Sequence, residues 1–203
     1  MDTIATLALA LGGSWASGIN MYLAALTIGI AGRVGAVRLP DGLQALESPW
    51  ILALACVLYA INFFADKIPA VETVNDFIHT FLRIPAGAVM AGAAVGDADP
   101  TVVAAAALVG GTLAFGSHAT KTSTRVAATG TVPGSGIGLS IAEDVAVVGG
   151  LWLAITNAVV FLILLTIVVG LMIWLLPKIF RLFVSVVRRV TGRRRLDSGG
   201  PTG

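Results

Sequence analysis

Charged residues are scarce in this chain, and their scarcity decides its class. Of 203 residues, 12% are charged and 57% are hydrophobic, and the mean hydropathy is +0.92. Soluble domains carry about 25% charged residues. Long apolar runs fill most of the sequence and leave no room for a sizeable soluble domain. The composition therefore excludes a soluble protein with a single anchor and predicts an integral membrane protein.

Several sequence signals of other protein classes are also missing. Cys56 is the only cysteine, so no intramolecular disulfide can form, and we expect it to serve in packing. No nucleophile elbow, phosphate loop, cysteine metal cluster or dinucleotide fingerprint is present. We therefore expect neither an enzyme nor a cofactor. The first apolar segment follows Asp2 without a basic region, so it should stay as a helix rather than be cleaved.

Apolar segments are abundant, and they predict an all-α membrane fold with about six transmembrane segments. A spanning helix needs about 20 mostly apolar residues. Glycines and polar residues interrupt several segments, which predicts broken or short helices. The turn at residues 97–100 divides the chain, with Asp99 suited to cap a helix that starts at Pro100. The expected segments are 3–32, 50–64, 84–96, 101–115, 139–154 and 155–176. The third is short for a full span and follows an amphipathic stretch at 70–83.

Two pairs of segments look like copies of each other. Residues 11–18 and 109–116 share a glycine pair, an alanine and a final glycine in register. Residues 64–71 align with residues 141–148 and place Asp66 opposite Glu143. Gly and Ala are abundant here, so chance similarity is the alternative to duplication. An odd number of segments per copy predicts two inverted three-helix repeats, 1–97 and 98–177, followed at 178–203 by a basic amphipathic segment and a disordered tail.

The basic segment also predicts the orientation of the chain. Its arginines should face the cytoplasm, and an even number of spans then puts the N-terminus there too. Arg33 and Arg38 fit less well, because this arrangement places their loop outside. Beside a spanning helix, the basic segment indicates contact with anionic membrane lipids rather than with nucleic acid.

Adjacent charged residues within apolar sequence form the first candidate site: Asp66, Lys67, Glu143 and Asp144. Ionised groups at membrane depth are costly, and they usually pair inside the bundle and serve function. The alternative is that Asp66 and Lys67 simply close a helix at the membrane interface.

A second group of candidates faces one side of a predicted helix. His118, Lys121 and Arg125 are spaced to share that side. They can bind an anion or lipid phosphate, or neutralise the acids above, and pairing is the more economical interpretation. Asn20 aligns with His118, so the two could line one cavity from opposite sides. The glycine pairs at 12–13 and 110–111 favour close packing or a helix break.

Glu72, Asp76 and His79 also share one helical face. Two carboxylates and an imidazole can hold a divalent ion. Amphipathic helices place polar residues on one face in any case, so a solvated face is the preferred interpretation.

Three short patterns resemble a known family. Residues 17–20 (Ser-Gly-Ile-Asn), 65–69 (Ala-Asp-Lys-Ile-Pro) and 140–144 (Ser-Ile-Ala-Glu-Asp) resemble, in this order, a bacterial family of small membrane proteins described as domain of unknown function 4126. The resemblance covers residues 5–175, and the Asp-Lys-Ile-Pro block is its most distinctive part. It implies a membrane location and supplies no activity.

These observations predict a small transporter or channel in the bacterial inner membrane. The substrate would be a small ion or an anionic solute, bound between the repeats by a shared set of polar residues. That set is Asn20, Asp66, Lys67, His118, Lys121, Arg125, Glu143 and Asp144. Carboxylates beside bases suit proton coupling, with His118 a candidate for titration. The alternative is a lipid-binding or scaffold protein with a structural charge network, and a homo-oligomer stays open in either case.

Overall fold

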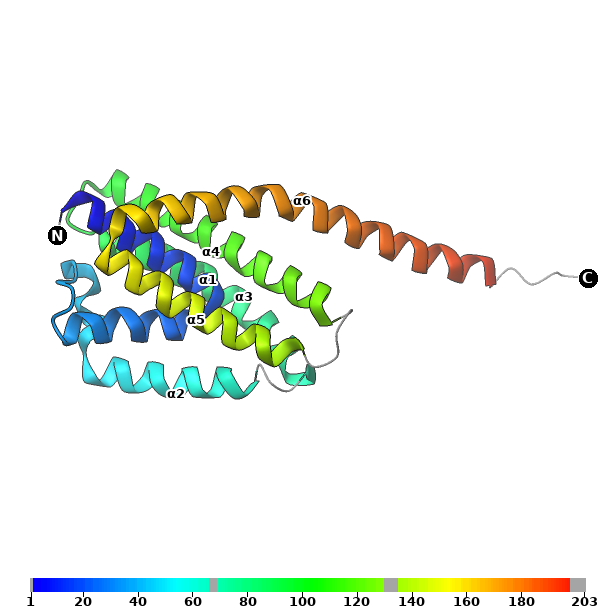
Figure 1. Cartoon of the computed structure of the whole chain (residues 1–203), viewed down its shortest axis with the longest axis horizontal. Coiled ribbons are helices and arrows are strands. Elements are labelled where there is room, and N and C mark those ends of the chain that lie inside the picture. Colours follow the sequence, from blue (N-terminus) through cyan, green and yellow to red (C-terminus); the bar gives the residue numbers. More distant parts are fainter. Residues whose placement is uncertain (1, 66–68, 130–134, 198–203) are drawn as a thin grey trace, which may run out of the picture.

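The computed structural model describes the backbone of residues 2–65, 69–129 and 135–197, and every regular element in those ranges is helical. The elements run side by side along one long axis (Figure 1). In chain order they are α1 (Thr3–Arg33), the 3-10 helix η1 (Asp41–Glu47), α2 (Pro49–Ala65), α3 (Pro69–Ala94), α4 (Pro100–Thr129), α5 (Ser135–Thr156) and α6 (Ala158–Asp197). The predicted all-α class is confirmed.

Polar and apolar side chains are distributed as in a membrane protein. Arg83 is 1% exposed, whereas Leu108 on the outside is 74% exposed. Within the described residues, four helices are long and apolar enough to cross a membrane, and a fifth qualifies if η1 and α2, bent by 68°, form one span. The four are Thr3–Arg33, Pro100–Arg125, Gly136–Thr156 and Ala158–Leu175. A membrane protein is therefore supported, but the count of six spans is not.

Helix α1 is not one straight rod but a helical hairpin. Its backbone leaves the helical conformation at Asn20, with φ −152° and ψ 95°. Residues 3–19 form a first arm, and residues 21–33 return beside it as a second arm (Figure 1). A Cβ atom placed at Gly13 would lie 3.2 Å from Ile28 Cδ1, a contact that a straight helix cannot make. Both ends of α1 therefore lie at the same end of the bundle.

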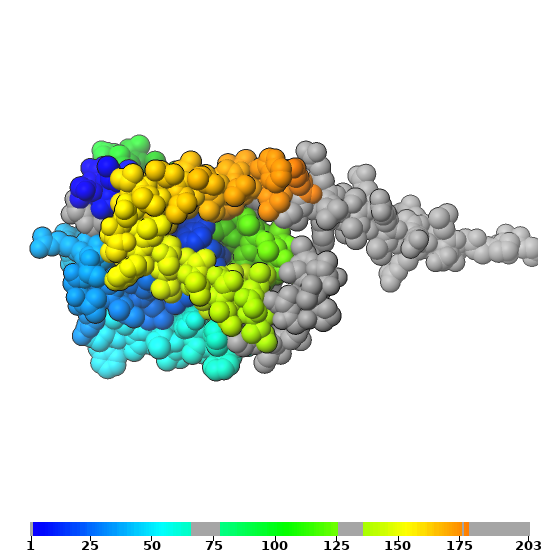
Figure 2. Space-filling view, viewed as in Figure 1, coloured from blue at the N-terminus to red at the C-terminus, as the bar shows by residue number. Residues whose placement is uncertain are grey.

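Thr3–Arg33 is long and apolar enough to cross a membrane as one straight helix, but it folds back at Asn20, and each arm is shorter than the hydrocarbon core. At about 1.5 Å per residue, the arms extend about 25 Å and about 20 Å, against a hydrocarbon core of about 30 Å. The tip therefore stops inside the bundle. In Figure 2, α5 and α6 form much of the visible face, and only small patches of α1 show between them. The core contains many small and aliphatic residues of α1, and α1 contacts every other helix.

The first arm of α1 lies parallel to α4. Ser117 Oγ donates to the Trp15 carbonyl at 2.9 Å, and Lys121 Nζ donates to the Ile19 carbonyl at 3.1 Å. These contacts advance in the same direction along both helices. The aligned blocks 11–18 and 109–116 thus lie side by side and parallel. They do not confirm the predicted inverted repeat, because an axis in the membrane plane would reverse one helix relative to the other.

Small residues allow the three central helices to approach closely. Ser14 of α1 donates to the Gly87 carbonyl of α3 at 2.8 Å, and a Cβ at Gly110 of α4 would lie 2.7 Å from Ser14 Oγ. A Cβ at Gly18 would collide with the backbone of Ala114. Of the two roles considered for the glycine pairs, packing is the one observed, because the break in α1 falls at Asn20 instead.

The turn at residues 97–100 forms as predicted. Asp99 Oδ1 accepts from the Thr101 amide at 2.8 Å, and this backbone hydrogen bond holds the pKa of Asp99 below its usual value. Helix α6 continues through Pro177, so the predicted boundary after residue 177 falls within a helix. The residues 198–203 of the expected tail lie outside the described part.

The two ends of the described chain lie at opposite ends of the molecule. Helix α1 begins at one end of the bundle, whereas α6 projects beyond the other (Figure 1). This differs from the expectation that both termini share one side. The physical reason is the hairpin, which enters and leaves the bundle at the same end and so adds no crossing.

Two glycine substitutions should separate packing from helix propensity. Gly18→Ala should lower the free energy of unfolding by about 1–3 kcal/mol, because the added methyl group meets backbone that cannot move aside. Gly149→Ala in α5 is the matched control, since nothing lies within 4 Å of its added Cβ. It should be neutral or stabilising by up to about 1 kcal/mol. Thermal unfolding in detergent measures both, and equal shifts would contradict the close crossing of α1 and α4.

Candidate functional site

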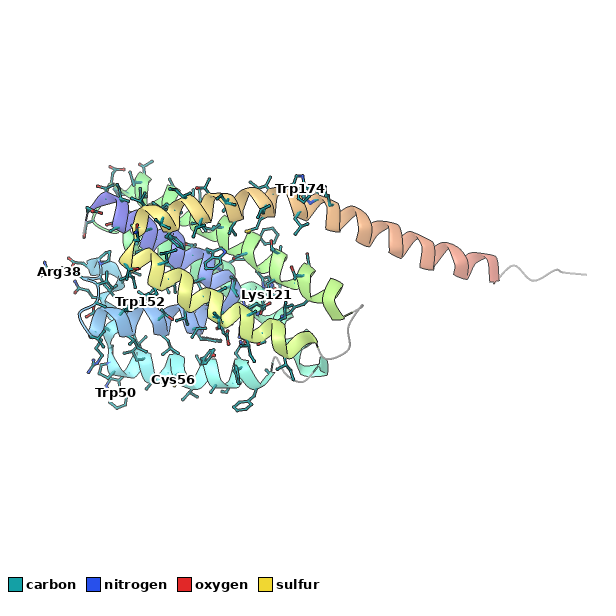
Figure 3. The ribbon with its side chains drawn as sticks, in the orientation of Figure 1. Arg38, Trp50, Cys56, Lys121, Trp152 and Trp174 are labelled. Atoms are coloured by element: carbon teal, nitrogen blue, oxygen red, sulfur yellow. The ribbon has the colours of Figure 1, made fainter. Side chains whose placement is uncertain are left out.

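Buried polar side chains gather around the tip of α1, in the interior where Figure 3 labels Lys121. They come from α1 to α5, so five helices meet at one place. The buried members are Asn20, Asn62, His79, Arg83, His118, Lys121 and Arg125, and the partly buried members are Tyr22, Tyr59, Thr80, Glu143 and Asp144. Tryptophans mark the two ends of the apolar bundle, with Trp50 at one end and Trp174 towards the other (Figure 3).

Asn20 holds the break in α1 together. Its Oδ1 accepts from the Leu23 amide at 3.2 Å, so Asn20 caps the N-terminus of the second arm. Its Nδ2 donates to Asp144 Oδ1 of α5 at 3.1 Å. Asp144 Oδ2 accepts in turn from the Tyr59 hydroxyl of α2 at 2.8 Å. One amide side chain therefore links the broken helix to α5 and, through Asp144, to α2.

Lys121 occupies the other side of the break. The Leu23 amide bonds to Asn20, so the Ile19 carbonyl at the end of the first arm is left to another donor. Lys121 Nζ donates to this carbonyl at 3.1 Å and lies 3.3 Å from Glu143 Oε2. A cation at a helix C-terminus is favoured by the partial negative charge of the carbonyls there.

Glu143 is the centre of a buried ion-pair network. Arg125 donates from Nε to Oε1 at 3.2 Å and from Nη2 to Oε2 at 2.7 Å, in the bidentate geometry of strong guanidinium–carboxylate pairs. Lys121 adds a second cation. The predicted pairing of Glu143 with Lys121 or Arg125 is therefore confirmed, and it involves both.

His118 takes part in a second hydrogen-bonded chain. Arg83 Nη1 lies 2.9 Å from His118 Nδ1, and Thr80 Oγ1 lies 2.7 Å from His118 Nε2. A guanidinium only donates, so Nδ1 must accept and the ring carries its proton on Nε2. In this geometry His118 accepts from Arg83, and its titration stays a prediction.

His79 and Arg83 show that the polar face of α3 is turned inward. His79 Nε2 lies 3.2 Å from the Tyr22 hydroxyl, and the two rings pack edge to face with centroids 5.6 Å apart. The preferred interpretation of a solvated face is therefore wrong for His79. The side chains of Glu72 and Asp76 lie outside the described part, so the metal-site alternative stays a prediction. No group of three or more metal-ligating side chains occurs within the part searched.

The structure brings most of the predicted site residues together. Asn20, His118, Lys121, Arg125, Glu143 and Asp144 all lie around the tip of α1. Asp66 and Lys67 lie outside the described residues.

Sequence reasoning missed Tyr22, Tyr59, Thr80 and Arg83, which contact the predicted residues directly. Arg83 had a visible signal, because it follows His79 by four residues and extends the same helical face into apolar sequence.

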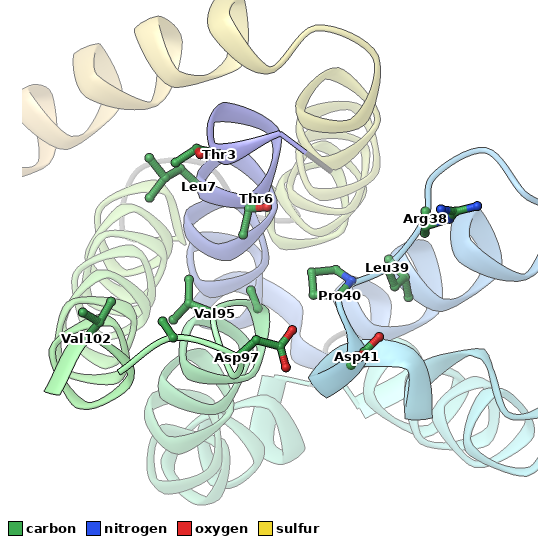
Figure 4. Close-up of a pocket in the computed structure, with 12 residues that line it drawn as sticks. Thr3, Thr6, Leu7, Arg38, Leu39, Pro40, Asp41, Val95, Asp97 and Val102 are labelled. Atoms are coloured by element: carbon green, nitrogen blue, oxygen red, sulfur yellow. The ribbon is translucent and has the colours of Figure 1, made fainter. Parts of the chain in front are cut away.

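An open depression of about 560 Å³ lies away from this cluster, at the end of the bundle where α1 begins (Figure 4). Its lining includes Thr6 of α1, Asp41 of η1 and Asp97, with Arg38 at its rim. It contains none of the groups around Asn20. We therefore place the chemistry at the tip of α1 and treat the depression as surface shape.

Replacing two asparagines should show how much the Asn20–Asp144 contact stabilises the protein beyond helix capping alone. Asn157→Ala removes an exposed cap of α6, whose Oδ1 lies 3.4 Å from the Val160 amide, and should cost about 1 kcal/mol of unfolding free energy. Asn20→Ala removes a buried cap and also leaves Asp144 without a donor. It should cost about 1–3 kcal/mol more. Thermal unfolding of both variants tests this, and similar losses would mean that the Asn20–Asp144 contact adds nothing.

Removing the charge of Glu143 should be strongly destabilising. Glu143→Gln removes the carboxylate that contacts both buried cations, so we expect a loss of about 3–5 kcal/mol. Asp97→Asn at the exposed turn is the control and should have little effect. A Glu143→Gln protein as stable as the wild type in chemical or thermal unfolding would argue against the ion-pair network.

Comparison with known proteins adds a family but no activity. The profile of the family described as Domain of unknown function (DUF4126) matches residues 7–178, which is most of the chain. No curated protein and no solved structure matches the chain. The resemblance inferred from the three short patterns is confirmed by this match. The chain belongs to the family described as Domain of unknown function (DUF4126).

Proposed function

We propose that this protein is a small transporter or channel for a small ion or an anionic solute, with its site at the tip of α1. The observation that carries the proposal is the break at Asn20, which places two helix ends inside an apolar bundle among charged side chains. Broken helices at membrane depth are characteristic of transporter binding sites, because they present backbone groups and helix dipoles to a solute.

The charges around the break support the same proposal. Lys121, Arg125, Glu143 and Arg83 are costly at membrane depth and are usually retained there for function. The second arm begins at Asn20, so its positive dipole end faces the cluster, which suits an anionic group. One non-helical residue joins the arms and provides a hinge at which the tip can move.

We further propose an inner-membrane orientation with the C-terminus in the cytoplasm. The end of the chain that α6 reaches carries the arginines of residues 178–195. The opposite end carries Arg33 and Arg38 together with a larger number of acids: Asp2, Asp41, Glu47, Asp97 and Asp99. The arrangement of the helices then puts the N-terminus on the far side, in place of the cytoplasmic N-terminus expected from six spans. Arg33 and Arg38 remain on the outside in this orientation too.

A structural charge network is the second candidate. Glu143 is paired by two cations, as expected of a scaffold that only holds the fold. In that case the protein would bind membrane lipids without transporting a solute. Stability and flux respond differently under the two proposals, so they can be separated with one set of variants.

The test uses two lysines. Purified wild-type protein in lipid vesicles should pass at least one of a panel of probes: chloride, inorganic phosphate, short carboxylates, sodium, potassium and protons. Lys121→Met removes the ammonium from the Ile19 carbonyl but leaves Arg125 on Glu143, so the protein should stay folded while flux falls to the level of empty vesicles. Lys178→Met removes an exposed lysine that lies over Trp174 and should leave flux unchanged.

Two results would favour the scaffold. The first is a wild-type protein that passes none of the probes. The second is a Lys121→Met protein whose flux falls only in proportion to the amount of folded protein, as judged by thermal unfolding.

A further inference from the structure

Two neighbouring carboxylates on α5 have very different surroundings. Glu143 is held by the Lys121 ammonium and the Arg125 guanidinium. Asp144 receives only neutral donors, from Asn20 Nδ2 at 3.1 Å and the Tyr59 hydroxyl at 2.8 Å. Neither of the ion pairs found in the described part of the bundle includes Asp144. Within the described residues, Glu143 therefore has two cationic partners, whereas Asp144 has only neutral donors.

The hydrogen bonds of Asp144 come from two other helices. From α1 comes the Asn20 amide, and from α2 comes the Tyr59 hydroxyl. The cations of α4, Lys121 and Arg125, are directed to Glu143 instead. A carboxylate at membrane depth that lacks a cation is the one that a proton can neutralise.

The geometry points to a proton site: we propose that Asp144 binds and releases a coupling proton, and that this proton controls the hairpin tip. The inference rests on the proposed transport function and names its coupling ion. A proton from water on one side of the membrane adds to a carboxylate oxygen of Asp144 and leaves to water on the other side. No other bond forms or breaks.

The link from Asp144 to the tip is direct. Asn20 uses Nδ2 to hold Asp144 and Oδ1 to cap the second arm. A proton on Asp144 Oδ1 turns this oxygen into a hydroxyl, which is a weaker acceptor, so the hydrogen bond from Asn20 Nδ2 is weakened. The same side chain that closes the break in α1 is then held less firmly on α5. Protonation thereby loosens the tip, and deprotonation strengthens the Asn20–Asp144 bond again.

A proton fits this site better than a metal cation. The carbonyl end of a half-helix is where a transporter commonly holds a cation. Here that place is taken by the protein's own ammonium, since Lys121 Nζ lies 3.1 Å from the Ile19 carbonyl. Asp144 is the acid that contacts Asn20, and its described neighbours offer hydrogen-bond donors rather than further anionic ligands.

Infrared difference spectroscopy of the protein in vesicles tests the proton site without any transported solute. Between neutral and acidic pH, the wild type should gain the carbonyl stretch of a protonated carboxylic acid. Asp144→Asn should lose this band, and Asp97→Asn, at the exposed turn, should keep it.

The outcomes separate this inference from the proposed function. Persistence of the band in a folded Asp144→Asn protein would overturn the proton site even if the wild type transports. A midpoint that depends on sodium concentration rather than on pH would also overturn it, in favour of a metal cation. A band that disappears with Asp144 in a protein that passes no probe would support the proton site and refute transport instead.

Discussion

A helix that breaks inside a membrane must find partners for the backbone groups it leaves open, since no water is there to bind them. In this protein that constraint is met at Asn20. Its side chain supplies the acceptor for the Leu23 amide, and Lys121 supplies the donor for the Ile19 carbonyl. The Asn20 amide and the Lys121 ammonium thereby bring polar groups into the bundle. The contacts of Glu143 and Asp144 follow from these two groups.

The ammonium of Lys121 in turn requires a carboxylate, because an unpaired charge in a low-dielectric interior is costly. Glu143 provides it and also binds Arg125. The neighbouring residue on α5, Asp144, is thereby left for Asn20 and Tyr59. Adjacent positions on one helix thus receive different tasks: Glu143 fixes α4 to α5, whereas Asp144 meets the movable tip.

The lipid surroundings also explain why amphipathic patterns are easily misread in such a chain. In water, the polar face of a helix turns outward, and α3 fits that expectation from its sequence. In lipid the preference is reversed, and His79 and Arg83 face the interior while apolar residues such as Phe81 face outward. The inward side chains of α3 then supply the Arg83–His118 contact.

The sequence by itself determined the class, the helical content, the cap at Asp99 and the pairing of the α4 cations with Glu143. These follow from composition, local hydrogen bonding and the cost of unpaired charge, which act over short distances or on the whole chain. Only the tertiary structure decided that α1 turns back at Asn20, that it lies parallel to α4, and that Tyr22 and Tyr59 join the cluster. The residues before and after Asn20 are equally apolar, so periodicity could not distinguish one long span from two arms. The choice depends on partners that come from α4 and α5, more than 100 residues away, and no local pattern contains them.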